Sequence, residues 1–409
     1  MLYRLEVENF FSIRDAQVLD LIVAPNVPDP DGRFAPIFDG AELRAPKVVA
    51  LYGANASGKT TILKALSFLF QFVANSSQRV VPGFFTCERF NDEESRSRPI
   101  RLAVELGGIM HLNQDVLARA SRGEPVETGT YRYELELACE NGAPARVMSE
   151  ALRQRPNGQG KWQRIFERDE NRNVKDSKIF SLTGFQHLLN TLNPNVSIIS
   201  SFALFQHPGA ILFAEEVRKS TFLLGPAPAI QDQALINYLA SHPTVLDELN
   251  KELRRIDVGV EAMKFIESPN GPQAFFTHSG LEVDMPWLLE SHGTHSFIKI
   301  FPAIAEALKT GSICAIDEFD SSIHPLVLPE VINWFYGISG RNPYDGQLWF
   351  TCHSASLLDD LNKEEIVICE KDRLGRTALH SLMDVKVRRD DNHYKKYLSG
   401  AYGGVPQIG

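Results

Sequence analysis

The amino-terminal part of the chain is marked by alternating polar and apolar positions. Residues 2–10 and 15–23 alternate in this way, which predicts a pair of β-strands. Residues 25–36 contain several prolines and a glycine, so we expect a loop there. A short apolar run at 47–52 then leads through a glycine-containing turn into a helical pattern over 60–72.

Beyond residue 80 the pattern changes twice. Residues 80–170 carry alternating, β-branched and aromatic signals that predict strands, with the clearest at 100–105, 131–137 and 162–168. Residues 178–255 then show a predominantly helical pattern.

From residue 257 onward, strands and helices alternate. Short strands are expected over 257–285. Further predicted helices cover 296–309 and 326–336, and predicted strands cover 312–316, 347–351 and 365–370. This alternation predicts an α/β fold. The sequence contains no internal repeat and no sustained heptad pattern, which argues against a long coiled-coil arm.

Composition narrows the class of protein. A length of 409 residues suggests two or three units or one enlarged domain. Hydrophobic residues make up 44% and charged residues 23%, which is ordinary for a globular protein, and the net charge of −9 argues against a general attraction to DNA or anionic membrane. The charge-free stretch 179–214 is broken by Asn, Gln and Pro and is no membrane span. We therefore expect a cytoplasmic protein without a membrane partner.

The cysteine content favours a reducing compartment. The five cysteines are odd in number, scattered and never in a C-x-x-C pair, so we expect neither a disulfide framework nor a Cys-rich zinc site. They are Cys87, Cys139, Cys314, Cys352 and Cys369.

A phosphate-binding loop follows the apolar run at 47–52. Residues 53–60 fit G-x-x-x-x-G-K-[ST] at every fixed position. Glycines let the backbone wrap a phosphate closely. Lys59 would reach the β- and γ-phosphates of a bound nucleotide, and the Thr60 hydroxyl would ligate Mg²⁺. The predicted nucleotide-binding residues here are Gly53, Ala54, Asn55, Ala56, Ser57, Gly58, Lys59, Thr60 and Thr61.

A second half-site lies far down the chain. The apolar residues 313–316 end in Asp317 and Glu318. Asp317 would serve the Mg²⁺ shell and Glu318 would polarise the attacking water. A solvated acidic turn is the alternative interpretation, and the presence of the phosphate-binding loop makes it less favoured.

Two further segments complete the set of candidates. His353 follows the strand at 347–351 and would contact the γ-phosphate. A lone histidine there is more often structural, but its position one helix and one loop after the acidic strand favours the functional interpretation. Ser291, Gly293 and Thr294 precede a helix and would form an anion-binding nest. The alternative is an ordinary N-cap at Ser291 or Thr294.

These pieces, in this order, resemble the ABC-type ATPase heads of the SMC/RecF/OLD group. Residues 7–15 look like the opening strands of that group. Residues 316–325, 131–136 and 397–409 are similar to the RloA/AbiL-like AAA-type ATPases of bacterial abortive infection. The resemblance implies a mixed sheet with flanking helices and an antiparallel β-subdomain.

The resemblance also implies roles for single residues. Asp317 and Glu318 serve Mg²⁺ and hydrolysis, and Asp320 and Ser321 fall in the D-loop. His353 matches the switch histidine. Ser291, Gly293 and Thr294 match the signature loop, although His292 stands between Ser and Gly. Gln71 and Gln78 are poor candidates for the Q-loop glutamine.

Several consequences follow from the resemblance. In such heads one chain cannot bring its own signature loop to its own phosphate-binding loop, so two chains enclose ATP head to tail as a homodimer or higher oligomer. We divide the chain into an ATPase lobe with the β-subdomain (1–175), a mainly helical insert (176–260) and a second ATPase lobe (261–409).

The preferred function is a bacterial anti-phage ATPase that controls a separate effector, such as a TOPRIM-like or RloB-like nuclease. A DNA or phage component is left open as a further partner.

The alternative is a RecF- or SMC-like ATPase of DNA repair, which needs a basic face and would show salt-dependent duplex binding. A transporter subunit and a GTPase are disfavoured, the latter because residues 362–365 only partly match N-K-x-D. The candidates for the basic face are Arg153, Arg155, Lys161, Arg164, Lys386, Arg388, Arg389, Lys395 and Lys396.

Overall fold

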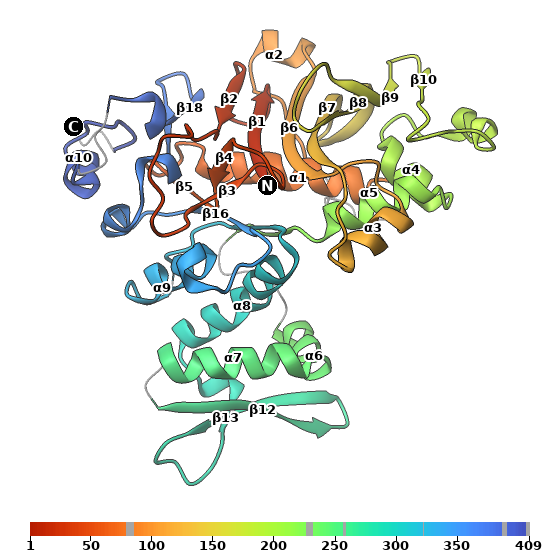
Figure 1. Ribbon diagram of the computed structural model, residues 1–409. Coiled ribbons are helices and arrows are strands. Elements are labelled where there is room, and N and C mark those ends of the chain that lie inside the picture. The colour runs from red at the N-terminus through yellow and green to blue at the C-terminus, as the bar shows by residue number, and fades with distance from the viewer. Residues whose placement is uncertain (79–85, 226–231, 257–258, 322, 387–390, 406–409) are drawn as a thin grey trace.

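The computed structural model describes residues 1–78, 86–225, 232–256, 259–321, 323–386 and 391–405. Its upper part is built on two sheets, and its lower part consists of helices and a small sheet (Figure 1). Helix α8 (His292–Thr310) belongs to the lower part and leads into the central strands. Among the helices that the structure describes, none is long and apolar enough to cross a membrane.

Seven strands form an antiparallel sheet in the upper part, in the order β10-β9-β8-β7-β6-β1-β2. The alternation seen at the start of the chain has its cause here, because Leu5 and Val7 of β1 are buried while Arg4 and Glu6 face outward. The strands are β1 (Leu2–Glu8), β2 (Gln17–Asp20), β6 (Ile100–Ile109), β7 (Thr128–Glu140), β8 (Ala143–Pro156), β9 (Gln163–Arg168) and β10 (Val174–Lys175).

The second sheet is mostly parallel and has the order β11-β15-β16-β5-β17-β18. Its central strands are buried along their whole length, which explains why they are continuous apolar runs. Only β18 runs antiparallel to its neighbour. The strands are β5 (Val48–Tyr52), β11 (Thr221–Leu223), β15 (Ile313–Ile316), β16 (Gln347–Thr351), β17 (Ile366–Lys371) and β18 (Thr377–Ser381).

Helix α1 (Lys59–Asn75) lies between the two sheets. Val49 and Leu51 of β5 share one hydrophobic core with α1 and the antiparallel sheet. Val48 and Ala50 point to the other face of β5 and pack in a second core with α8 and α9 (Val327–Phe335). The parallel sheet is thus covered on both sides, so its strands are fixed relative to α1.

The remaining elements surround these two cores. A hairpin of β12 and β13 forms the lower end of the molecule beside α7 (Figure 1). Short 3₁₀ helices lie in several connections. The other elements are α2 (Glu93–Ser97), α3 (Gln114–Ser121), α4 (Ile198–Leu204), α5 (Pro208–Arg218), α6 (Asp232–Ser241), α7 (Pro243–Ile256), α9 (Val327–Phe335), α10 (His393–Leu398), β3 (Phe34–Pro36), β4 (Arg44–Pro46), β12 (Val260–Ser268), β13 (Gly271–His278) and β14 (Met285–Pro286).

This architecture confirms the predicted fold class: a mixed sheet with flanking helices beside an antiparallel sheet. Residues 176–260 are mainly helical but are divided by β11, which pairs with β15 in the parallel sheet. Helices α4 and α5 pack on α1, whereas α6 and α7 pack in the lower part. Helix α8 begins at His292, earlier than the pattern at 296–309 indicated.

The cysteines form no disulfide framework, but one pair is bonded, which the sequence analysis did not predict. Cys87 and Cys139 form a disulfide, while Cys314, Cys352 and Cys369 are free and buried. Cys139 lies in β7, and the backbone N–H of Cys87 donates to the carbonyl of Gly142 in the following turn. The two residues are 52 positions apart, so their proximity depends on sheet pairing that spacing in the sequence does not show.

A buried ion pair connects β8 to β9. The side chains of Glu150 and Arg168 are 0% and 1% exposed, with Oε2 and a guanidinium nitrogen 3.7 Å apart. Glu150 also accepts from the Tyr133 hydroxyl at 2.9 Å and from the backbone N–H of Ile198. Burial raises the pKa of Glu150, and the Arg168 guanidinium acts against that rise. Each charge therefore depends on its partner for compensation.

We predict that Glu150→Ala destabilises the protein by about 3–5 kcal/mol, because it leaves the Arg168 guanidinium buried without a counter-charge. Replacing both residues by Met should cost much less. Arg101→Ala breaks an exposed pair with Glu136 and should cost below ~1 kcal/mol. Thermal unfolding of the three variants and the wild type measures this, and equal shifts for Glu150→Ala and Arg101→Ala would contradict it.

Candidate nucleotide-binding site

The phosphate-binding loop lies between β5 and α1. Gly53 and Gly58 have φ of 152° and 108°, values that L side chains rarely adopt. A Cβ at Gly53 would overlap the carbonyl oxygen of Cys369, and a Cβ at Gly58 would overlap the Thr377 side chain. Glycine is therefore required at both positions by backbone conformation and by space. The closely wrapped loop is a cradle that fits a phosphate group.

Lys59 points its ammonium into the loop. Nζ donates to the carbonyl oxygens of Gly53 at 2.8 Å and Ala54 at 3.1 Å, and the residue is 5% exposed. Burial lowers the pKa of Lys59, while nearby acidic groups, including Asp317, act in the opposite direction. Because neutral carbonyls do not cancel the charge, this ammonium suits an anion such as a phosphate.

The acidic strand end meets the phosphate-binding loop. Ile316 of β15 pairs with Phe350 of β16, so the carboxyl ends of these parallel strands lie together. Asp317 follows β15, and its Oδ1 accepts from the hydroxyls of Thr60 at 3.0 Å and Thr351 at 2.6 Å. Thr60 and Asp317 together supply the oxygen ligands that suit Mg²⁺.

Glu318 has an unusual backbone conformation at this edge. Its φ is 50°, a left-handed value that costs a non-glycine residue about 1–3 kcal/mol. The Glu318 N–H donates to Thr351 Oγ1 at 2.7 Å, and its side chain is exposed. The turn therefore directs two consecutive carboxylates differently: Asp317 is held by hydroxyls, and Glu318 stands at the opening.

Asp320 holds the segment after β16. Its Oδ2 accepts from the backbone N–H groups of His353 at 3.0 Å and Ser354 at 2.7 Å. The His353 side chain is exposed and lines the same cleft as Glu318. Asp320 thus acts within its own chain by fixing the backbone that carries His353.

Most of the predicted residues surround one cleft of about 1480 Å³. Gly53 and Ala54 lie at its base, where their carbonyls receive Lys59. The predicted residues that line it are Asn55, Ala56, Ser57, Gly58, Lys59, Thr60, Thr61, Asp317, Glu318, Asp320, Ser321 and His353. The cleft is the place where residues from the two halves of the sequence meet.

The predicted signature residues lie elsewhere. In the described part of the chain, Ser291, Gly293 and Thr294 do not line the cleft. They form the first turn of α8, where Ser291 is the N-cap and its hydroxyl accepts from the Thr294 N–H at 3.0 Å. Local structure here therefore matches the N-cap alternative. Ser291 is exposed and Thr294 is buried.

The two glutamines considered for a Q-loop lie far from the cleft. Gln71 is in the last part of α1, twelve residues after Lys59, which corresponds to about 18 Å along a helix. Its Oε1 accepts from Asn75. Gln78 follows beyond the end of the helix. This position is incompatible with contact to a metal beside Thr60.

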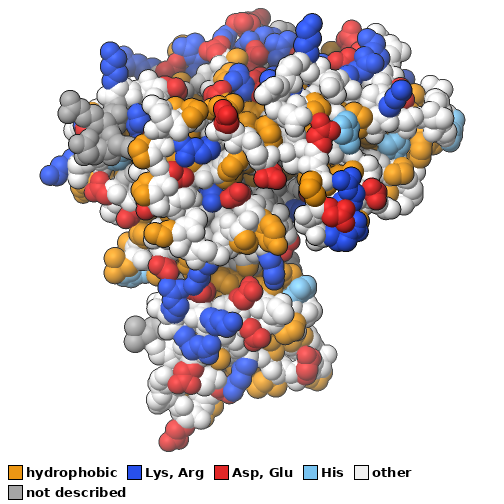
Figure 2. All heavy atoms as spheres, viewed as in Figure 1, with side chains coloured by type: hydrophobic (Ala, Val, Ile, Leu, Met, Phe, Trp, Pro, Cys, Tyr) orange, Lys and Arg blue, Asp and Glu red, His pale blue; other side chains and the backbone are white. Residues whose placement is uncertain are grey.

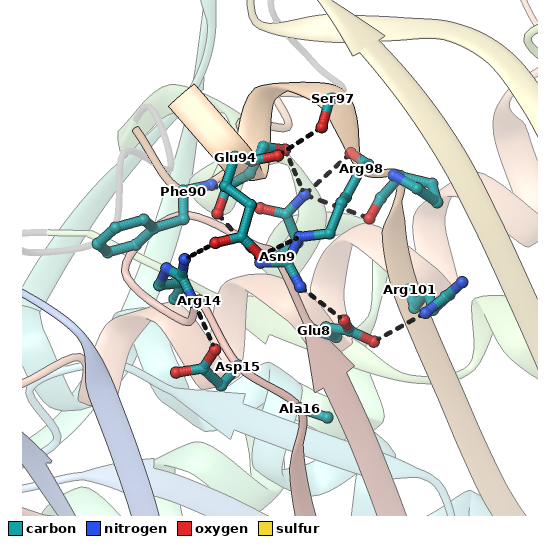
Figure 3. A network of polar contacts seen from close by, with 12 residues as sticks. Glu8, Asn9, Arg14, Asp15, Ala16, Phe90, Glu94, Ser97, Arg98 and Arg101 are labelled. Carbon is teal, nitrogen blue, oxygen red and sulfur yellow. Dashed lines mark hydrogen bonds and ion pairs between the residues drawn. The ribbon is translucent and has the colours of Figure 1, made fainter. Parts of the chain in front are cut away.

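One wall of the cleft, residues 88–96, was missed by sequence reasoning. The buried Asn9 holds this wall: its Nδ2 donates to the carbonyls of Ser95 and Arg98 at 2.9 Å, and its Oδ1 accepts from the Phe90 N–H (Figure 3). Arg14 adds an ion pair to Asp92 at 2.6 Å. Asn9 lies in the 7–15 segment, so that segment has a defined structural task.

Other lining residues gave no recognisable motif. Thr351 was detectable only as the residue that ends a buried strand two positions before His353. The rest come from three separate segments: Phe11, Ser12, Glu88, Arg89, Phe90, Asn91, Arg96, Lys371, Leu374 and Gly375.

The comparison with protein families decides the assignment. Residues 48–359, about three-quarters of the chain, match the family described as "AAA domain, putative AbiEii toxin, Type IV TA system". The chain belongs to this AAA-domain family. The match spans the phosphate-binding loop, the acidic strand end and His353, and it confirms the predicted ATPase family. The closer relation to RloA/AbiL-like proteins stays a prediction.

Three of the solved structures similar to this AAA-domain protein are heads of SMC proteins. An SMC head bound to the C-terminal winged-helix domain of ScpA is 14% identical, with a TM-score of 0.43, over 94% of this chain and 99% of that one. The SMC head from Thermotoga maritima is 12% identical, with a TM-score of 0.39, over 94% and 99%. One from Pyrococcus furiosus, bound to the C-terminal domain of ScpA, is 12% identical, with a TM-score of 0.41, over 98% and 100%. No curated protein matches the sequence.

We predict that Thr351→Val lowers the ATPase rate by about 10–100-fold, because it removes a hydrogen bond to the charged Asp317 and leaves the Glu318 N–H without an acceptor. Nucleotide affinity should change much less. The matched control is Thr277→Val, which removes a similar Thr–Asp hydrogen bond of 2.9 Å in the small lower sheet. Steady-state phosphate release gives the rate, and an unchanged rate in Thr351→Val would contradict the assignment.

Proposed function

We propose that this chain binds ATP with Mg²⁺ between two copies arranged head to tail, hydrolyses it, and thereby controls a separate effector in bacterial anti-phage defence. The observation that carries the proposal is the incomplete cleft. One chain supplies the Lys59, Asp317 and Glu318 side of a triphosphate site, whereas the turn at Ser291 lies outside that cleft. A second copy provides the missing side in this arrangement.

The surface next to Ser291 supports a partner there. Leu288 and Leu289 are 87% and 70% exposed, and Val283 is 79% exposed. Trp287 is buried and stacks on His295 at 4.2 Å, so the turn is anchored while its leucines project outward. Large exposed apolar side chains beside the turn favour a contact surface there.

The catalytic and metal-binding residues predicted in the cleft have distinct roles in hydrolysis. The Lys59 ammonium binds the β- and γ-phosphates, and Thr60 and Asp317 would hold Mg²⁺. When bound, Mg²⁺ supplies charge neutralisation of the phosphates. Glu318 accepts a proton from the attacking water, and His353 contacts the γ-phosphate from the segment that Asp320 holds. In the partner copy, Ser291, Gly293 and Thr294 close the site.

The effector is proposed to be a separate protein, with a TOPRIM-like or RloB-like nuclease as the first candidate. The family description refers to a putative toxin of a Type IV TA system, and the choice of a separate effector follows from the resemblance to RloA/AbiL-like ATPases. The division into lobes 1–175 and 261–409 with an insert at 176–260, and the closer relation to RloA/AbiL-like ATPases, belong to the same proposal.

The DNA-repair alternative finds less support in the charges. Arg153 forms ion pairs with Glu134 and Glu167, and Arg155 lies over the Trp162 ring. On the face in Figure 2, basic and acidic side chains are interspersed. Arg388 and Arg389 lie outside the described residues. The candidate residues that the structure describes are thus partly neutralised within the chain.

The GTPase alternative also finds little support, because the residues that partly match N-K-x-D have another role. Asn362 caps a short 3₁₀ turn and forms a capping box with Glu365. Glu365 is buried and pairs with Arg33 at 2.8 Å. Asn362 and Glu365 therefore stabilise this turn.

Mixing two inactive variants tests the head-to-tail arrangement. Lys59→Ala should abolish nucleotide binding, and Ser291→Arg should block the partner's site. In a mixed dimer one site receives both changes and the other receives none, so an equal mixture should regain about a quarter of the wild-type ATPase rate. Each variant alone, at the same total concentration, is the control. Absence of any recovery after subunit exchange would contradict closure by a second copy.

Glu318→Gln is expected to trap the assembled state, because the amide no longer accepts the proton from water. Hydrolysis should fall by about 10²–10⁴-fold while ATP binding is retained. Light scattering should then show dimers or larger oligomers in ATP that disperse when ATP is removed. Hydrolysis at the wild-type rate would show that Glu318 lacks this role.

A further inference from the structure

The hairpin of β17 and β18 packs against the phosphate-binding loop from behind. Ile368 of β17 pairs with Tyr52 of β5, so β17 continues past the residue that precedes Gly53. Lys371 pairs with Thr377, which brings the first residue of β18 beside the loop. The turn of this hairpin contributes Lys371, Leu374 and Gly375 to the cleft.

Thr377 is the contact point. It is 2% exposed, and its Oγ1 lies 2.8 Å from the carbonyl oxygen of Ser57 and 2.8 Å from the hydroxyl of Ser12. Its backbone N–H donates to the Ser12 carbonyl at 2.7 Å. The Ser12 hydroxyl lies 3.1 Å from that of Thr61 in the first turn of α1. Three segments far apart in the sequence therefore meet at three hydroxyl groups.

The chemistry of these groups makes Thr377 the donor to the loop. The Ser57 carbonyl can only accept, so the hydrogen bond to it uses the Thr377 hydroxyl proton. The Ser12 hydroxyl is a second acceptor for Thr377, and Ser12 shares a further hydrogen bond with Thr61 in which either hydroxyl can donate. The three hydroxyls thus connect the first turn of α1 to Thr377 and, through Thr377, to the backbone of the loop.

A loop that points its N–H groups at a phosphate turns carbonyls the other way. Such a carbonyl needs a donor when it is buried. Thr377 supplies that donor to Ser57 and packs directly against Gly58, where a Cβ would overlap it. The hydroxyl therefore acts on the two residues that immediately precede Lys59.

We infer that Thr377 is a positioning residue of the nucleotide site, which holds the phosphate-binding loop in its binding conformation through Ser57 and the Ser12–Thr61 pair. This inference rests on the proposed function. It adds a residue 320 positions from Ser57 to the apparatus that binds the phosphates.

Thr377→Val tests the inference, since valine retains the shape and lacks the hydroxyl. The KM for ATP and the dissociation constant of a fluorescent ATP analogue should rise about 10-fold, while kcat changes less than about 2-fold, as for one lost hydrogen bond used in binding. Thr377→Ser should restore affinity to near wild type. Ser12→Ala should weaken affinity in the same direction and carries the test if Thr377→Val does not fold.

Thr310→Val is the matched control. It removes a threonine hydroxyl that donates to the Glu306 carbonyl at 2.8 Å near the end of α8, and it should leave ATP affinity unchanged. Equal ATP affinity in Thr377→Val and wild type, or no rescue by Thr377→Ser, would overturn this inference and leave the proposed function standing. Lack of ATP binding by the wild-type protein would instead overturn the proposed function.

Discussion

The Asp317 carboxylate is the point on which the site depends. One of its oxygens accepts from Thr60 at the start of α1 and from Thr351 at the end of β16, while Asp317 itself directly follows β15. A single atom thus connects the phosphate-binding loop to two strands that follow it by more than 250 residues. The parallel register of β15, β16 and β5 makes this possible, because it brings their carboxyl ends to one edge.

The arrangement at this edge shows which features of the fold and the site could be predicted from the sequence. The phosphate-binding loop is a local motif whose glycines are required by φ, and the buried parallel strands are continuous apolar runs, so both could be predicted. Asp317, Glu318 and His353 follow predicted strands, and their meeting follows from parallel pairing. Thr377 and Asn9 carry no motif, because their importance arises from contacts between segments that come together only after folding.

The misjudged features have the same physical origin. The disulfide of Cys87 and Cys139 depends on how β7 turns into β8, which spacing does not encode. The start of α8 is decided by the Ser291 hydroxyl, which caps the helix earlier than the apolar pattern begins. The separation of residues 176–260 into parts of the upper and lower cores follows from β11, a three-residue strand too short for a clear pattern.

The packing of Leu2 and Gly404 has a practical consequence for anyone who labels the protein. Leu2 exchanges backbone hydrogen bonds with the Gln347 side chain. Gly404 packs against Gly53 and donates to Glu370. An insertion at either residue would disturb packing next to β16 or the phosphate-binding loop. The turn at Gly160, where an added side chain meets nothing within 4 Å, is a safer place for an inserted epitope or fluorophore.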